Sequence, residues 1–211
     1  MNTSIEVLLP EVLRLIFLHT QVSQACYESH YYYRMRHSQL PWNLGQVCRQ
    51  WKGIALSTSA LWTQIPNLDL DASKTCTASY AEYLSENLRR SHLVPVYMQI
   101  SGEFIPTLHG SIINIVVRNS ERIRALKLQS GSIMPALKGM KGRLSSLERL
   151  TLDLNRKFEE ALCDLFETAP LLSDVYVRIH TSSSKLALPF HQILRYEESA
   201  WNSSSIGKHF D

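Results

Sequence analysis

Four short apolar segments that share one template recur along the second half of the chain, and this recurrence restricts the fold more than any other feature. The template is L-x-x-L-x-L with conservative replacements, and the starts of successive segments are 30, 24 and 25 residues apart. A period of roughly 20 to 30 residues is typical of stacked strand–helix units that bury a shared core. We therefore expect a leucine-rich-repeat-like array over residues 93–196, with segments beginning at Leu93, Ile123, Leu147 and Leu172. An ordinary α/β sheet whose strands share this period is the alternative.

The intervals between these segments also favour strand–helix units. Leu108 to Val116 and Phe158 to Phe166 place apolar residues at helical spacing, so each interval predicts a helix. Asn155 occupies the position at which such repeats often carry an asparagine that bonds the turn backbone, whereas the other three segments carry different residues there. The sequence therefore predicts an irregular array.

The N-terminal residues predict a helix that is apolar on nearly all sides. Pro10 is suited to the first turn of a helix, where the backbone N–H that proline lacks has no partner. The apolar residues that follow form one face and its flanks: Val12, Leu13, Leu15, Ile16, Phe17 and Leu18. A domain of about 60 residues has little interior in which to bury such a helix. We expect a partner protein to cover one side, and full burial within the domain is the alternative.

A second helix is predicted from Pro41 to about Leu56. Its apolar stripe repeats at helical spacing and consists of Leu44, Val47, Cys48, Trp51, Ile54 and Ala55. Leu61 and Trp62 then return to the core. Residues 20–40, between the two helices, show no clear period, so we expect an inserted loop or a weak helix there.

Composition excludes several classes of protein. The 211 residues carry a formal net charge of +3, which is too small to indicate a nucleic-acid-binding protein by itself. The longest apolar stretch is interrupted by Pro10, Glu11 and Arg14, so no membrane span is expected. The N-terminus shows no pattern of a secretory signal. The four cysteines are scattered in the sequence, which indicates reduced thiols and a cytoplasmic or nuclear protein.

No catalytic, cofactor or metal motif stands out, so we expect neither an enzyme nor a cofactor. The only concentration of possible zinc ligands is Cys26, His30, His37 and Cys48, and its spacing differs from that of zinc modules, which usually pair ligands closely. Cys163 has no histidine with an evident role beside it, so we interpret it as a packing residue.

Three consecutive tyrosines from Tyr31 lie beside Arg34 and Arg36 in the predicted insert. A basic, aromatic segment of this kind is compatible with nucleic-acid binding, but the basic excess is small and no reading element is recognisable. We favour a solvated face or a patch that attracts an acidic protein.

Three blocks of the N-terminal sequence occur in a specific order. Leu8 to Phe17 reads L-L-P-E-V-L-R-L-I-F, Val47 to Ala55 reads V-C-R-Q-W-K-G-I-A, and Leu61-Trp62 follows. This order resembles the F-box, and the chain is similar to a class of fungal (basidiomycete-like) F-box proteins with degenerate leucine-rich repeats. The insert between the first two blocks is about ten residues longer than in a compact F-box.

The resemblance implies the substrate-recognition adaptor of an SCF-type cullin-RING ubiquitin ligase. The F-box would bind the Skp adaptor subunit, and through it a cullin, while the repeats would recruit an unidentified target protein. The residues assigned to Skp binding are Leu8, Leu9, Pro10, Glu11, Leu13, Ile16, Phe17 and Val47. The residues assigned to the F-box core are Val12, Leu44, Cys48, Trp51, Ile54, Leu61 and Trp62.

The expected fold class is therefore α+β, with an N-terminal all-α F-box helical domain followed by an irregular leucine-rich-repeat-like α/β solenoid. The expected divisions are residues 1–66, a connecting helical segment 67–92, the array 93–196 and a mobile tail 197–211. We also expect a short or truncated member of the class, with its last repeat incompletely covered. Two alternative functions are an F-box scaffold outside a ligase and a nucleic-acid-binding protein that uses the basic insert.

Overall fold

A single parallel sheet of six strands organises the molecule. The structure, a computed structural model, describes residues 8–25, 40–71, 77–154, 163–179 and 186–200. The strands are β1 (Leu68–Asp69), β2 (Val96–Ser101), β3 (Ile123–Leu128), β4 (Arg149–Leu154), β5 (Asp174–Ile179) and β6 (Arg195–Ala200). Each strand pairs in parallel with the next strand of the sequence, so the order in the sheet is β1-β2-β3-β4-β5-β6.

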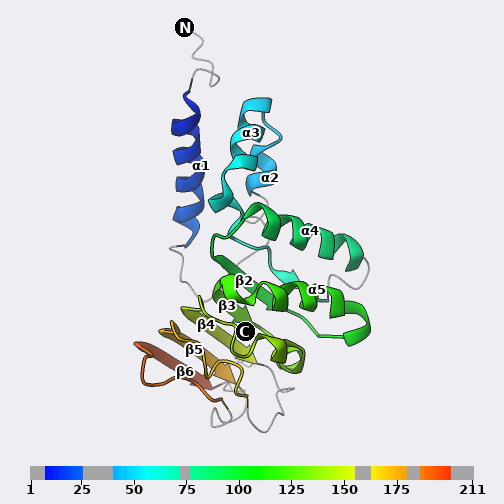
Figure 1. The fold of residues 1–211 in the computed structure, drawn as a ribbon, viewed down its shortest axis with the longest axis vertical. Coiled ribbons are helices and arrows are strands. Elements are labelled where there is room, and N and C mark those ends of the chain that lie inside the picture. Colours follow the sequence, from blue (N-terminus) through cyan, green and yellow to red (C-terminus); the bar gives the residue numbers. More distant parts are fainter. Residues whose placement is uncertain (1–7, 26–39, 72–76, 155–162, 180–185, 201–211) are drawn as a thin grey trace, which may run out of the picture.

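One face of the sheet is covered by α4 (Thr77–Arg90), α5 (Pro106–Arg118) and the 3₁₀ segment η5 (Gly131–Met140) (Figure 1). Their apolar side chains and the inward positions of the strands form one large core. The strand register aligns two apolar rows across this core: Met98, Leu126, Leu150 and Val175, and Ile100, Leu128, Leu152 and Val177. These rows are continuous because parallel strands covered by helices bury every second side chain.

Four more elements precede the sheet, above it in Figure 1. They are α1 (Pro10–Ala25), α2 (Leu40–Leu44), α3 (Arg49–Ser57) and the 3₁₀ turn η2 (Ser59–Trp62). A second, smaller core joins them, consisting of Leu13, Phe17, Ala55, Leu61 and Trp62. The single helix predicted from Pro41 to Leu56 is two helices, and α3 begins after Cys48, which has an extended backbone.

The predicted fold class is wrong. The chain is an α/β protein with an all-parallel six-stranded sheet, not an all-α domain followed by a solenoid. The N-terminal helices are not separate from the sheet, because Trp42 and Trp62 both contact Arg90 of α4. The backbone of Thr63 also accepts a hydrogen bond of 2.9 Å from the N–H of Tyr97 in β2.

The units that follow β3 also depart from a strand–helix repeat. The connection between β3 and β4 is η5, a 3₁₀ segment that contains Pro135. The helix predicted from Phe158 to Phe166 lies partly outside the described residues, and its described part after Cys163 is a turn. By contrast, the helix predicted through Leu108 is confirmed as α5.

In the sheet, the first template segment pairs with the second in a register two residues away from the one that the template predicts. The template equates Val96 with Leu126, but in the sheet Met98 is the residue paired with Leu126. Leu93, which the template places in the core, is 88% exposed. Val96, Met98 and Ile100 are all buried at alternate positions, so the template fits two registers and only strand pairing distinguishes them.

The sixth strand was not predicted. It begins at Arg195 and runs to Ala200, so it includes the first residues of the expected tail 197–211. At the positions that are apolar in β5, β6 carries Tyr196 opposite Val175 and Glu198 opposite Val177. The tyrosine hydroxyl donates a hydrogen bond of 2.9 Å to the Glu198 carboxylate. Polar groups at these positions suit the last strand of the described sheet, since a further apolar row would stay exposed.

Candidate functional site

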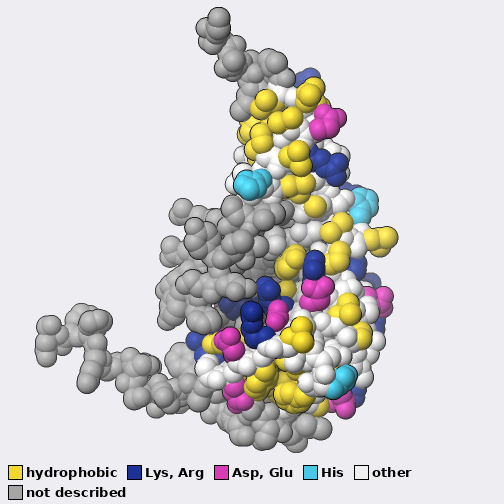
Figure 2. All heavy atoms as spheres, turned by 90° about the vertical axis from the view of Figure 1, so that its left-hand side faces the viewer, with side chains coloured by type: hydrophobic (Ala, Val, Ile, Leu, Met, Phe, Trp, Pro, Cys, Tyr) yellow, Lys and Arg dark blue, Asp and Glu magenta, His cyan; other side chains and the backbone are white. Residues whose placement is uncertain are grey.

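The outer side of α1 presents a row of exposed apolar side chains. Leu9 and Leu15 are 65% and 66% exposed, and Leu8, Val12 and Ile16 are also exposed. Figure 2 shows hydrophobic side chains gathered along this helix, in the upper part of the view. Spacings of three and four residues place Val12, Leu15 and Ile16 on one side of the helix. We call the set Leu8, Leu9, Val12, Leu15 and Ile16 the α1 surface.

The opposite side of α1 holds the helix in place. Leu13 and Phe17 are buried, one turn apart, and the Phe17 ring packs edge-on against Trp51 of α3 with 4.8 Å between ring centroids. The side-chain amide of Gln50 donates a hydrogen bond of 3.3 Å to the backbone oxygen of Leu8. α1 is therefore fixed by its inner stripe, and the α1 surface stays exposed without loss of packing.

The structure divides the predicted partner residues between surface and core. Leu8, Leu9, Pro10, Glu11, Ile16 and Val47 are exposed, as a partner-binding role requires. Leu13 and Phe17, which were also assigned to Skp binding, are instead buried in the small core. Leu15, which was not among the predicted site residues, is as exposed as Leu9. The sequence feature that could have identified Leu15 is its apolar side chain on the flank of the predicted helix.

The predicted core residues are also divided. Leu61 and Trp62 are buried, and the Trp62 indole N–H donates a hydrogen bond of 2.8 Å to the Ala55 carbonyl. Leu44, Trp51 and Ile54 are partly buried and pack against the same core, whereas Cys48 is partly buried but is not part of this packing. Val12, predicted in the core, is 40% exposed and belongs to the α1 surface.

A second candidate surface is the face of the sheet opposite the helices. Its side chains alternate with the buried ones and are mostly charged, tyrosine or amide groups. At the beginning of the strands there is a depression of about 100 Å³ lined by Tyr97, Arg124, Ala125, Glu148, Arg149 and Asp174. We call this side of the sheet the open face.

The charges of the open face are largely compensated within it. Arg124 donates a hydrogen bond of 2.8 Å to Glu148, which raises the pKa of the arginine. Arg149 lies 3.7 Å from Asp174, and Arg178 forms an ion pair with Asp153. Exposed pairs of this kind contribute little to stability. The depression therefore has no strong charge of one sign with which to select a ligand.

Lys127 lies in the middle of the open face, next to Thr151 in the strand register. Burial lowers the pKa of its ammonium, and the charge of Arg178 lowers it further, whereas Asp153 opposes the shift. This side chain is thus a partly desolvated cation, and no group of three or more His, Cys, Asp or Glu side chains is arranged to hold a metal ion in the described residues.

The described part of the chain holds neither a candidate metal site nor a membrane-spanning helix. No group of three or more His, Cys, Asp or Glu side chains there has the arrangement to hold a metal ion. No helix within the same residues is long and apolar enough to cross a bilayer. Cys48 and Cys163 are not part of a disulfide. Cys26, His30 and His37, the other members of the candidate zinc set, lie outside the described residues, as does the basic insert at 31–36.

Comparison with known proteins gives no relative: no family model, no curated protein and no solved structure matches the chain.

Proposed function

We propose that the protein is an adaptor that binds the Skp subunit of a cullin-RING ubiquitin ligase through the α1 surface. One observation carries this proposal. Five exposed apolar side chains lie on α1 and on the two residues before it, and this segment has the order of the first F-box block. Exposed apolar groups that are contiguous mark interaction sites in folded proteins.

The chemistry of the α1 surface supports a helix-packing partner. Complete burial of an aliphatic side chain contributes roughly 1.5–3 kcal/mol, so burying the remaining exposed half of each residue contributes about 1 kcal/mol. Leu9 and Leu15, which have the largest exposed fractions, should contribute most. Glu11 and Arg14 are exposed on the same helix and supply charged groups at the rim.

The open face is the surface that we propose for recruitment of the target protein. It is rich in arginine and tyrosine, residue types that are enriched at the energetic centres of protein interfaces. In this proposal the chain carries out no bond chemistry. It raises the local concentration of a target beside a tethered ligase.

Co-expression with a Skp subunit tests the proposal. The wild-type chain should be retained on the tagged subunit, and Leu15→Asp should abolish retention because a charge replaces an exposed apolar contact. Leu93→Asp is the matched control, since Leu93 is an exposed leucine outside α1. The proposal is wrong if the wild type is not retained where a known F-box protein is, or if both variants are retained equally.

The same preparation distinguishes a ligase adaptor from a scaffold. When cullin is supplied together with the Skp subunit, an adaptor should bring both into one complex. Retention of the Skp subunit without cullin would instead identify a scaffold outside the ligase.

A further inference from the structure

The C-terminal end of α4 lies between the two cores of the molecule. Its last residue, Arg90, places its guanidinium carbon 5.4 Å from the ring centroid of Trp42 and 4.9 Å from that of Trp62. The two indole rings belong to the N-terminal helices and pack edge-on, with centroids 5.0 Å apart. Glu86, one turn earlier in α4, forms an ion pair with Arg90, with 2.6 Å between the carboxylate oxygen and the guanidinium nitrogen. The cation is therefore directed into the aromatic part of the small core.

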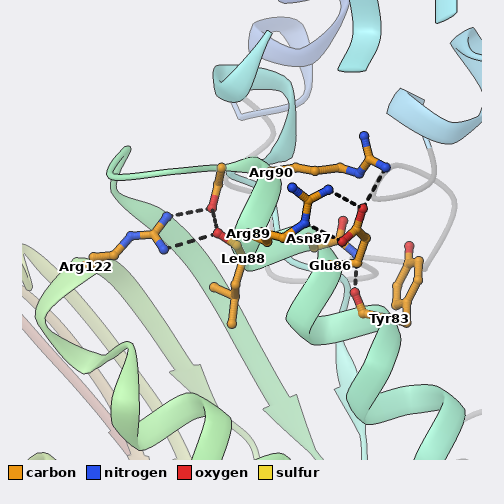
Figure 3. A network of polar contacts seen from close by, with 8 residues as sticks. Tyr83, Glu86, Asn87, Leu88, Arg89, Arg90 and Arg122 are labelled. Atoms are coloured by element: carbon orange, nitrogen blue, oxygen red, sulfur yellow. Dashed lines mark hydrogen bonds and ion pairs between the residues drawn. The ribbon is translucent and has the colours of Figure 1, made fainter. Parts of the chain in front are cut away.

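The same end of α4 is held from the other side by the sheet. Arg122, the residue directly before β3, donates hydrogen bonds to the Leu88 carbonyl at 3.2 Å, the Ser91 hydroxyl at 2.6 Å and the Val94 carbonyl at 3.1 Å. Figure 3 shows Arg122 reaching the helix end from one side, while Arg90 extends away from it on the other. α4 is thus fixed to the sheet independently of Arg90.

Another described attachment between the N-terminal helices and the sheet is formed by the backbone. Residues Thr63 to Ile65 run beside β2, where Tyr97 donates to the Thr63 carbonyl at 2.9 Å and accepts from the Ile65 N–H at 3.0 Å. The N-terminal helices also contact α4, where the Tyr83 ring lies 6.1 Å from that of Trp42 between centroids. Arg90 supplies the cation of this second attachment and is the residue that reaches both Trp42 and Trp62.

We propose that Arg90 is a positioning residue that holds the α1 surface at one orientation relative to the open face. The proposal deepens the adaptor function and rests on it for its use, because an adaptor must present its target at a defined place relative to the ligase. A cation that lies over two aromatic rings is attracted by both, and the ion pair with Glu86 fixes the direction of the guanidinium.

Three variants isolate this role. Arg90→Met keeps an apolar stem but removes the cation, and Arg90→Lys keeps a cation. Arg89→Met is the matched control, because Arg89 also bonds Glu86, at 2.7 Å and 2.8 Å, but its side chain is 66% exposed. We expect Arg90→Met alone to release the N-terminal helices, and Arg90→Lys to restore the wild-type orientation.

Residual dipolar couplings of the backbone amides measure the orientation directly. In the wild type, Arg90→Lys and Arg89→Met, couplings from α1 and α3 and from β2 to β5 should fit one alignment tensor. In Arg90→Met they should require two tensors, while the chemical shifts within each group stay close to those of the wild type. Capture by the Skp subunit should be unchanged in all three variants.

Two results would overturn the proposal. The first is a single tensor with the wild-type orientation in Arg90→Met. The second is a general loss of dispersed signals in that variant, because Arg90 would then support the core of the sheet as well. Failure of the wild type to bind the Skp subunit would overturn the adaptor function and leave the result on orientation standing.

Discussion

Replacement of Arg122 by methionine should destabilise the chain strongly, because one guanidinium satisfies three acceptors of the α4–β2 connection. The acceptors are the Leu88 and Val94 carbonyls and the hydroxyl of Ser91, a residue with 0% exposure. Hydrogen bonds to a charged group contribute about 1.5–3 kcal/mol each, so three at the low end come to about 4.5 kcal/mol. Burial lowers the pKa of Arg122, which indicates a desolvation cost that offsets part of this sum. We expect a loss of about 3 kcal/mol.

Urea denaturation followed by circular dichroism measures this loss. With a denaturant dependence of about 2–3 kcal/mol per molar urea for a chain of this size, the midpoint of Arg122→Met should fall by about 1 M. The exposed Arg118 provides the control, because Arg118→Met should change the free energy of unfolding by less than about 0.5 kcal/mol. Equal urea midpoints for the two variants would refute the conclusion that the hydrogen bonds of Arg122 attach α4 to the sheet.

Three further outcomes are expected. Trp62→Ala should cost about 3–5 kcal/mol and lower the urea midpoint, since the ring is buried and contacts Arg90; an unchanged midpoint would contradict its place in the small core. The hydrogen bond from Arg89, together with the charge of Arg90, lowers the pKa of Glu86 from 4.5 to about 2. A lowered pKa means that the carboxylate stabilises the fold fully above pH 4.5 and that this stabilisation is lost as the pH falls towards 2. In Glu86→Gln the urea midpoint should therefore depend less on pH over that range than in the wild type. The same pH dependence of the midpoint in both proteins would disprove this. Thiol titration of denatured protein without reductant should count all four cysteines, with buried Cys163 unreactive in the native state, whereas a count of two would indicate a disulfide.

The strands of the sheet were predictable where their inward positions are apolar. Leu126 and Leu128 in β3 and Leu150 and Leu152 in β4 follow the template and are buried. In β6 the same positions are occupied by Tyr196 and Glu198, so hydrophobic alternation gives no signal there. β1 has only two residues, which is too short for any period.

The fold class was not predictable from the same pattern, because it depends on how the helical segment joins the sheet. That junction is made by Arg90 and the rings of Trp42 and Trp62, which are distant in sequence. The hydrophobic pattern treats each of these residues as part of its own helix. It carries no information about a contact between a cation at one helix end and aromatic rings from earlier elements.

The apolar excess of α1 was predictable from the sequence, but which of its residues are exposed was not. The apolar excess of α1 correctly indicated more apolar surface than the small core buries. Leu13 and Ile16 are chemically equivalent in the sequence, yet the first is buried and the second is 44% exposed. The packing of Phe17 on Trp51 decides which side of the helix faces inward, and this requires the position of α3.

Titration calorimetry of the purified chain with a Skp subunit tests the adaptor proposal most directly. We expect one-to-one binding with a negative heat-capacity change, because the α1 surface is apolar. Leu9→Asp and Leu15→Asp should each weaken the affinity at least about tenfold, a loss of about 1.4 kcal/mol, while Leu93→Asp should bind like the wild type. Absence of binding by the wild type, or equal affinities for all three variants, would contradict the proposal.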